Sequence, residues 1–274
     1  MAKRIIVAVI FVPILLAIIL FLPPFWWALV VAFISGMAAF ELLRATGEGK
    51  ITIPMWVVTL LSAVLIPLGN WAGQGVAVAC TCLFVVTAVS FWCAIRAYDE
   101  GDVSLGFYHV LLTLFAGAAI PLGLSALVQL RGMAQGRYLV LLAVLLSFIT
   151  DGAAYFGGVF LGKHRGVTKV SPKKSVEGYF CGFAGGVIFA VLYGLVIGAI
   201  EGCEVALIPL GLCGLLGALV TELGDLVFSF IKRQFGVKDY GHLLPGHGGM
   251  LDRFDSMIFC GPVILFIVYY LPVF

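Results

Sequence analysis

Long apolar runs, each about the length needed to cross a bilayer, constrain the fold of this chain more than any other feature. A transmembrane helix needs about 20 predominantly apolar residues, and such runs follow one another along most of the sequence. Only 11% of the residues are charged and the mean hydropathy is +1.16, whereas a soluble domain carries about 25% charged residues. So little charge cannot cover a surface that faces water. We therefore expect an all-α, polytopic membrane protein.

The apolar runs predict about nine transmembrane helices. The first run resembles a signal peptide, but it ends in Pro23-Pro24 without a small-residue cleavage site, so we expect it to stay as the first span. The predicted spans are 5–22, 25–43, 53–69, 74–95, 107–129, 138–160, 180–200, 205–229 and 256–273.

The distribution of basic residues predicts the orientation. With the N-terminus in the cytoplasm, all of the 16 Lys and Arg residues except Arg131 and Arg137 fall on the cytoplasmic side. This positive-inside bias predicts a cytoplasmic N-terminus, a C-terminus on the opposite side and two large polar segments facing the cytoplasm. The chain is compact and shows no targeting extension, which favours the inner (cytoplasmic) cell membrane. The net charge of only +2 gives no indication of a nucleic-acid partner.

Three regions are predicted along the chain. Residues 1–104 form N-terminal membrane helices, and residues 105–179 form middle helices with a cytoplasmic basic loop. Residues 180–274 form the C-terminal helices with the second polar segment, which we expect to be catalytic. No repeat relates the two halves of the sequence, which argues against a transporter built from inverted repeats.

Carboxylates interrupt the apolar spans at a few positions. Asp151, Glu222 and Asp225 lie inside or at the end of a span, where a charge usually faces a protein cavity and has a partner. Glu222 and Asp225 are three residues apart, which places them on one helix face. Asp252 and Asp255 repeat this spacing at the start of the last span. Two pairs of hard oxygen ligands suit Mg²⁺, and helix capping with internal ion pairs is the alternative interpretation.

Both cytoplasmic polar segments are suited to phosphate. The segment before the last span contains Pro245-Gly246-His247-Gly248-Gly249, in which glycines let backbone amides approach an anion, and it is rich in Lys and Arg. The other segment, 171–178, reads SPKKSVEG and combines hydroxyls with lysines; Ser175 is placed to cap the following helix. A plain turn and a lipid-surface basic patch are the respective alternatives.

From Gly224 the sequence reads GDLVFSFIKRQFGVKDYGHLLPGHGGMLDRFDS, which resembles the signature of the phosphatidate cytidylyltransferases, or CDP-diacylglycerol synthases. A second similar block runs from Asp151 to Gly178. One departure is Phe228, where many relatives carry Glu. The matching positions are Ser229, Lys232, Arg233, Lys238, Asp239, His247, Gly248, Gly249, Asp252, Arg253 and Asp255.

The resemblance implies the reaction CTP + phosphatidate → CDP-diacylglycerol + pyrophosphate. It also implies Mg²⁺, a monovalent cation such as K⁺ and a homodimer, and it places the substrate phosphatidate among the membrane lipids. The in-line attack of the lipid phosphate on the α-phosphorus of CTP would depend on positioning and charge neutralisation, since the attacking phosphate is already ionised.

Residue roles follow from the resemblance together with the charge pattern. The predicted catalytic residues are Asp225, Asp252 and Lys232. The predicted metal ligands are Glu222, Asp225, Asp252 and Asp255. The predicted substrate-binding residues are Ser171, Lys173, Lys174, Ser175, Ser229, Arg233, Lys238, His247, Gly248, Gly249 and Arg253.

Two rival functions fit part of the sequence. A cation-coupled transporter would explain the intramembrane carboxylates, but not the glycine-rich loop or the cytoplasmic lysines. A membrane kinase that uses CTP on another lipid, such as a polyprenol, would transfer the γ-phosphate and release CDP.

Overall fold

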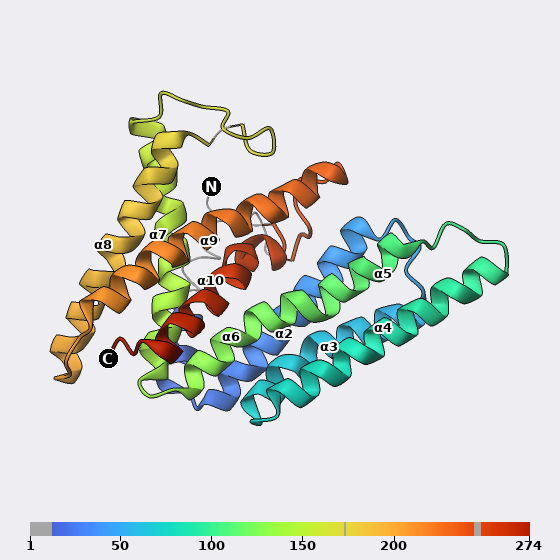
Figure 1. Ribbon diagram of the computed structural model, residues 1–274, viewed down its shortest axis with the longest axis horizontal. Helices are drawn as coiled ribbons and strands as arrows, with labels where there is room; N and C mark the ends of the chain where they lie inside the picture. Colours follow the sequence, from blue (N-terminus) through green and yellow to red (C-terminus); the bar gives the residue numbers. More distant parts are fainter. Residues whose placement is uncertain (1–12, 173, 244–247) are drawn as a thin grey trace. The chain divides into compact units, whose positions relative to one another are not determined.

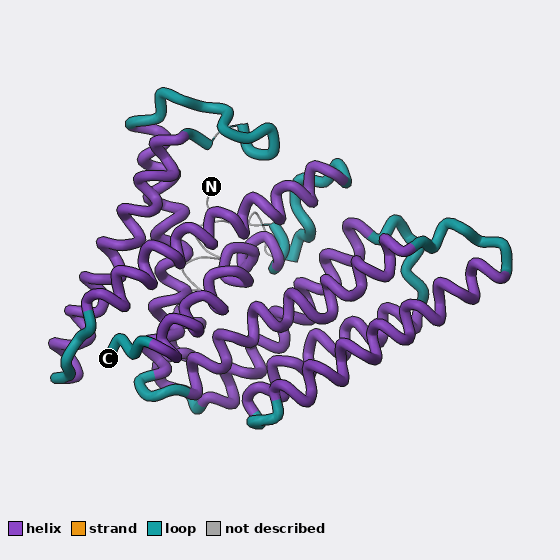
Figure 2. The backbone as a smooth tube through the Cα atoms, viewed as in Figure 1, coloured by secondary structure: helices purple, strands orange, loops and turns teal. Residues whose placement is uncertain are grey.

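The computed structural model describes residues 13–172, 174–243 and 248–274, and within them the fold is all-α (Figure 1 and Figure 2), as predicted. Seven helices in these described residues are long and apolar enough to cross a membrane. They are α2 (Pro24–Thr46), α3 (Ile53–Trp71), α4 (Gly75–Asp99), the continuous run Phe107–Gly132, α7 (Gly136–Phe160), α8 (Val176–Glu201) and α9 (Leu207–Gln234).

The predicted first and last spans differ from these seven. Residues 13–21 are helical, and the start of the first span lies outside the described residues. The last helix, α10 (Leu251–Tyr270), begins earlier than the predicted span 256–273 and carries Asp252, Arg253 and Asp255 in its first two turns. Charged residues therefore interrupt the apolar pattern at the start of this helix. The count of nine spans and the orientation of the termini stay predictions.

The chain divides into two compact units that interleave in sequence. One comprises the chain up to Gly132 together with Phe235–Phe254, and the other comprises Met133–Gln234 together with Asp255–Phe274. The three regions predicted from the sequence are consecutive stretches of chain and are not defined by contacts, so that division stays a prediction.

In the first unit, α2 and α3 pack against the run Phe107–Gly132, which consists of α5 (Phe107–Leu114), the π-helix η1 (Phe115–Ala119) and α6 (Ile120–Gly132). The ring N–H of Trp27 on α2 donates to the carbonyl of Leu127 at 3.0 Å. The hydroxyl of Ser62 on α3 donates to the carbonyl of Gly117 in the π-helical turn at 2.5 Å. Polar groups at membrane depth need protein partners, and these bonds join the helices while they satisfy that need.

In the second unit, α7, α8 and α9 lie side by side (Figure 1). Glycines set how closely α8 and α9 approach: a Cβ on Gly214 would lie 2.6 Å from the Cα of Val187 and 2.7 Å from the carbonyl oxygen of Gly186. Small residues allow such close backbone contact between membrane helices. A loop connects α7 to α8 (Figure 2), and its residue Lys174 contacts α9, where the candidate site is found.

Candidate active site

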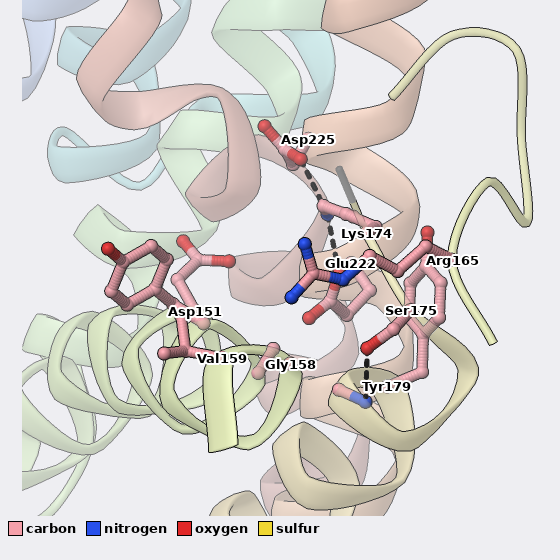
Figure 3. Close-up of a pocket in the computed structure, with 12 residues that line it drawn as sticks. Asp151, Gly158, Val159, Arg165, Lys174, Ser175, Tyr179, Glu222 and Asp225 are labelled. Atoms are coloured by element: carbon pink, nitrogen blue, oxygen red, sulfur yellow. Dashed lines mark hydrogen bonds and ion pairs between the residues drawn. The ribbon is translucent and has the colours of Figure 1, made fainter. Parts of the chain in front are cut away.

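A cavity of about 510 Å³ opens in the second unit, between α7, α8, α9 and the loop that precedes α8 (Figure 3). Apolar spans surround it, yet carboxylates and cations enter it from several elements. Its described lining residues are Asp151, Ala154, Tyr155, Gly158, Val159, Arg165, Lys174, Ser175, Gly178, Tyr179, Glu222 and Asp225.

Lys174 forms a bridge between two carboxylates of α9. Its Nζ lies 2.6 Å from Oε2 of Glu222 and 2.6 Å from Oδ2 of Asp225 (Figure 3). Burial by itself lowers the pKa of Lys174, but the negative charges of Asp225 and Glu222 outweigh it and raise that pKa above its ordinary value. The ammonium is therefore charged at neutral pH. The predicted one-face placement of Glu222 and Asp225 is what allows one cation to reach both.

Glu222 keeps an unused acceptor. Its side chain is only 3% exposed, and Oε1 is buried without a hydrogen-bond partner among the described residues. Buried polar atoms are nearly always satisfied, so such an exception calls for a donor or a cation. Asp151 on α7 lines the same cavity (Figure 3). Three carboxylates thus line the cavity, and the Lys174 ammonium leaves one oxygen of Glu222 unsatisfied.

The loop before α8 is folded by its own hydrogen bonds. Ser175 caps α8, as predicted, because its Oγ accepts the backbone N–H of Gly178 at 3.1 Å. An antiparallel bridge pairs Arg165 with Ser175. The carboxylate of Glu177 accepts the backbone N–H of His164 at 3.2 Å and contacts its ring Nδ1 at 2.5 Å. This fold brings Arg165 to the cavity together with Lys174.

Arg165 was not among the predicted site residues. In the sequence, Arg165 is one of several cations in a basic loop, and no pattern sets it apart. In the structure, its bridge to Ser175 distinguishes it from the other cations. Its guanidinium projects into the cavity toward Asp151 and Lys174 (Figure 3). A bidentate guanidinium is well suited to phosphate oxygens.

The first unit contains a second buried carboxylate arrangement. Glu41 on α2 is 3% exposed, and its two oxygens accept the backbone N–H groups of Met250 at 2.9 Å and Leu251 at 2.8 Å. These amides are at the N-terminus of α10, where backbone donors lack intrahelical partners. A Cβ on Gly241 or Gly249 would overlap the Glu41 carboxylate. Glu41 therefore fixes the end of the signature segment.

The sequence prediction missed Glu41, although a signal was present. It is a lone carboxylate inside the predicted span 25–43, and intramembrane carboxylates are functional candidates by default. Its partners are backbone amides, which no residue pattern reveals.

Asp252 organises the segment from within. Its Oδ2 accepts the backbone N–H of Tyr240 at 2.8 Å and that of Gly249 at 3.0 Å. Gly248 has φ +84°, a conformation that favours glycine. Asp252 thus holds the loop that precedes α10 through backbone N–H groups, and its metal role stays a prediction. Asp255, in the second unit, is 7% exposed and accepts the N–H of Ser256 at 2.8 Å.

The predicted site residues that the structure describes fall into three groups. Those at the cavity are Lys174, Ser175, Glu222 and Asp225. Those in the second unit but not among the described lining residues are Ser171, Ser229, Lys232, Arg233 and Asp255. Those in the first unit are Lys238, Gly248, Gly249, Asp252 and Arg253. Lys173 and His247 lie outside the described residues.

Two further positions take a structural explanation. Arg233 donates from Nε to the carbonyl of Val170 at 3.5 Å, which ties the end of α9 to the basic loop. Phe228, where many relatives of the resembled family carry Glu, is fully buried and packs edge-on against Phe259 at 6.4 Å. Here the position serves packing between α9 and α10.

Known proteins match the chain over nearly its whole length. A family model described as the cytidylyltransferase family matches residues 2–271. The chain is 34% identical to a phosphatidate cytidylyltransferase of Staphylococcus epidermidis over 263 residues, covering 95% of this chain and 94% of the relative. It is 32% identical to that of Bacillus subtilis (85% of each) and 33% identical to that of Mycobacterium bovis (89% of this chain, 80% of the relative). The chain is a multi-pass membrane protein that belongs to the cytidylyltransferase family.

Proposed function

We propose that this protein is a phosphatidate cytidylyltransferase, which converts CTP and phosphatidate to CDP-diacylglycerol and pyrophosphate. The observation that carries the proposal is the near end-to-end match to bacterial relatives of that name. A cavity with paired carboxylates and two cations, Lys174 and Arg165, supports it from the structure.

The proposed reaction is a single in-line displacement. An oxygen of the phosphatidate phosphate attacks the α-phosphorus of CTP, and the bond from that phosphorus to the bridging oxygen of the β-phosphate breaks. The leaving pyrophosphate takes the electron pair. The attacking phosphate is ionised at neutral pH, so no strong general base is needed, and the protein acts by positioning and charge neutralisation. Arg165 and Lys174 would bind phosphate oxygens within the cavity.

A divalent cation such as Mg²⁺ fits the carboxylates of this cavity. The buried, unpartnered Oε1 of Glu222 and the adjacent carboxylate of Asp225 are hard oxygen donors of the kind that Mg²⁺ prefers. When bound there, Mg²⁺ would neutralise the charge of the phosphates. The proposed ligand roles of Asp252 and Asp255 rest on their spacing in the sequence and on the resemblance, and the catalytic role of Lys232 and the accompanying K⁺ rest on the resemblance.

We further propose that the enzyme works as a homodimer in the inner membrane with the site facing the cytoplasm. The basic bias of the predicted cytoplasmic segments supports the orientation. Phosphatidate stays in the bilayer while CTP arrives from water, so a site at this interface can serve both substrates.

One assay tests the reaction against its rivals. The purified protein is incubated with phosphatidate, Mg²⁺ and CTP labelled at the α-phosphate, and label in the lipid fraction is counted. Transfer of α-label with release of pyrophosphate is expected. In a parallel sample with CTP labelled at the γ-phosphate, transfer of that label to lipid with release of CDP would instead identify a lipid kinase. Nucleotide-independent ion flux in liposomes would identify a transporter.

A further inference from the structure

We propose that Lys174 is an internal counter-ion of the metal site, and that a divalent cation binds Glu222 and Asp225 only when a nucleotide triphosphate draws the Lys174 ammonium away. This inference rests on the proposed function and adds a coupling between its two ligands. The nucleotide and the metal bind together, and neither binds tightly alone.

The first argument is one of space. The ammonium lies 2.6 Å from one oxygen of Glu222 and 2.6 Å from one oxygen of Asp225. A divalent cation held by these same two oxygens would occupy the space that the ammonium fills. Two cations would repel each other strongly there. Metal binding by these two oxygens, with Oε1 of Glu222 as a further donor, therefore requires Lys174 to leave.

The second argument comes from the unsatisfied acceptor. The ammonium uses one oxygen of Glu222, and the other oxygen, Oε1, is buried without a partner among the described residues. Because buried acceptors are nearly always satisfied, this oxygen calls for a further donor or a cation. The carboxylate pair therefore offers an oxygen that Lys174 does not use.

The third argument concerns where the ammonium goes. Lys174 belongs to the loop before α8 and not to a helix, and its side chain is 23% exposed at the cavity. If it left without a new partner, both the ammonium and the carboxylates would lose their counter-charges, which is costly for buried groups. A triphosphate in the cavity supplies the new anionic partner. The exchange then moves Lys174 from carboxylate to phosphate while the metal takes its place.

Thermodynamic linkage makes the idea measurable. If the nucleotide raises the affinity for the metal, the metal raises the affinity for the nucleotide by the same factor. Removing the ammonium should free the carboxylates for metal in the absence of nucleotide. It should also remove most of the coupling.

The test uses the full-length protein in detergent, with Mn²⁺ as the probe and no phosphatidate, so that no turnover occurs. Free Mn²⁺ is followed by electron paramagnetic resonance, with and without CTP, against protein-free samples that contain Mn²⁺ and CTP. We expect the wild type to bind Mn²⁺ weakly alone and at least tenfold more tightly with CTP. Lys174→Met should bind Mn²⁺ without CTP at least tenfold more tightly than the wild type, and CTP should add little. Lys169→Met, an exposed cation of the same loop, should behave as wild type.

A double variant controls for the possibility that Lys174→Met binds Mn²⁺ because it is misfolded. Lys174→Met with Glu222→Gln should lose the new nucleotide-independent Mn²⁺ binding while it elutes as the single variant does. The proposal is overturned if the wild type binds Mn²⁺ equally with and without CTP, or if Lys174→Met gains no affinity. Failure of the cytidylyl-transfer assay with an intact Mn²⁺ exchange would reject the proposed function and leave the counter-ion role standing.

Discussion

The carboxylate of Glu41 accepts the backbone N–H of Leu251 at 2.8 Å, although 210 positions separate the two residues in the sequence. Through this bond and its partner at Met250, the second helix of the chain holds the first turn of the last one. A carboxylate at a helix N-terminus also compensates the positive end of the helix dipole. The start of α10 is therefore fixed by a residue from the first unit's membrane helices, and this gives the first prediction.

Glu41→Gln should weaken both stability and turnover. The substitution replaces one of two acceptors with an NH₂ group. Because both Glu41 oxygens accept backbone N–H groups, either orientation of the amide places that NH₂ against a donor. Loss of a buried hydrogen bond that leaves its donor unsatisfied costs about 1–3 kcal/mol. We expect a lower midpoint of thermal unfolding in detergent and at least tenfold lower CDP-diacylglycerol formation. Glu48→Gln, at an exposed turn, is the control, and equal behaviour of the two variants would contradict the role given to Glu41.

Asp225→Asn should abolish CTP-dependent product formation while the protein still inserts and purifies. The amide removes the negative charge that pairs with Lys174 at 2.6 Å and that would hold a divalent cation. We expect turnover to fall by at least about 100-fold, a typical effect of removing a charge that stabilises a transition state. Asp99→Asn, an exposed carboxylate at the end of α4, should retain wild-type turnover. Near-wild-type activity of Asp225→Asn would reject the metal assignment.

Asp252→Asn separates a charge effect from a structural one. The Oδ2 atom accepts two backbone N–H groups, from Tyr240 and Gly249, and the carbonyl oxygen of an asparagine can accept both. Asn should therefore keep the thermal stability of the segment within about 0.5 kcal/mol, while Ala, which loses both bonds, should not. We expect turnover to be lost in both variants. Full activity of Asp252→Asn would show that the residue acts only through these hydrogen bonds.

The fold class could be predicted because each span consists of consecutive residues whose apolar character is visible in the sequence. A run of about 20 apolar residues predicts a transmembrane helix, and this prediction needs no information about the other segments of the chain. The same local rule was less reliable for α10, where Asp252 and Asp255 interrupt the apolar pattern within the helix itself. There the hydrogen bonds of the helix start are made by side chains, including Glu41, that lie elsewhere in the chain.

The site was predictable only where its residues are close in sequence. The spacing of Glu222 and Asp225 placed both on one face, and that prediction needs only helix geometry. Lys174 was predicted to bind phosphate, but its pairing with Glu222 spans 48 positions and depends on how the loop before α8 folds. Arg165 reaches the cavity for the same reason, through its bridge to Ser175. Contacts of this kind depend on tertiary packing, and the spacing of residues along the chain does not predict them.

Gly214→Ala tests whether the close approach of α8 and α9 supports the site. The added methyl would lie 2.6 Å from the Cα of Val187, so the backbones must separate, and overpacking of this kind costs about 1–3 kcal/mol. Glu222 and Asp225 lie two and three turns further along the same α9 helix, so a shift of α9 would move both away from Lys174. We therefore expect lower thermal stability together with lower turnover. Gly211→Ala, one turn earlier on α9 with no atom within 4 Å of the new Cβ, should leave both unchanged. If the two variants unfold at the same temperature and turn over at the same rate, the glycine contact does not set the position of the carboxylates.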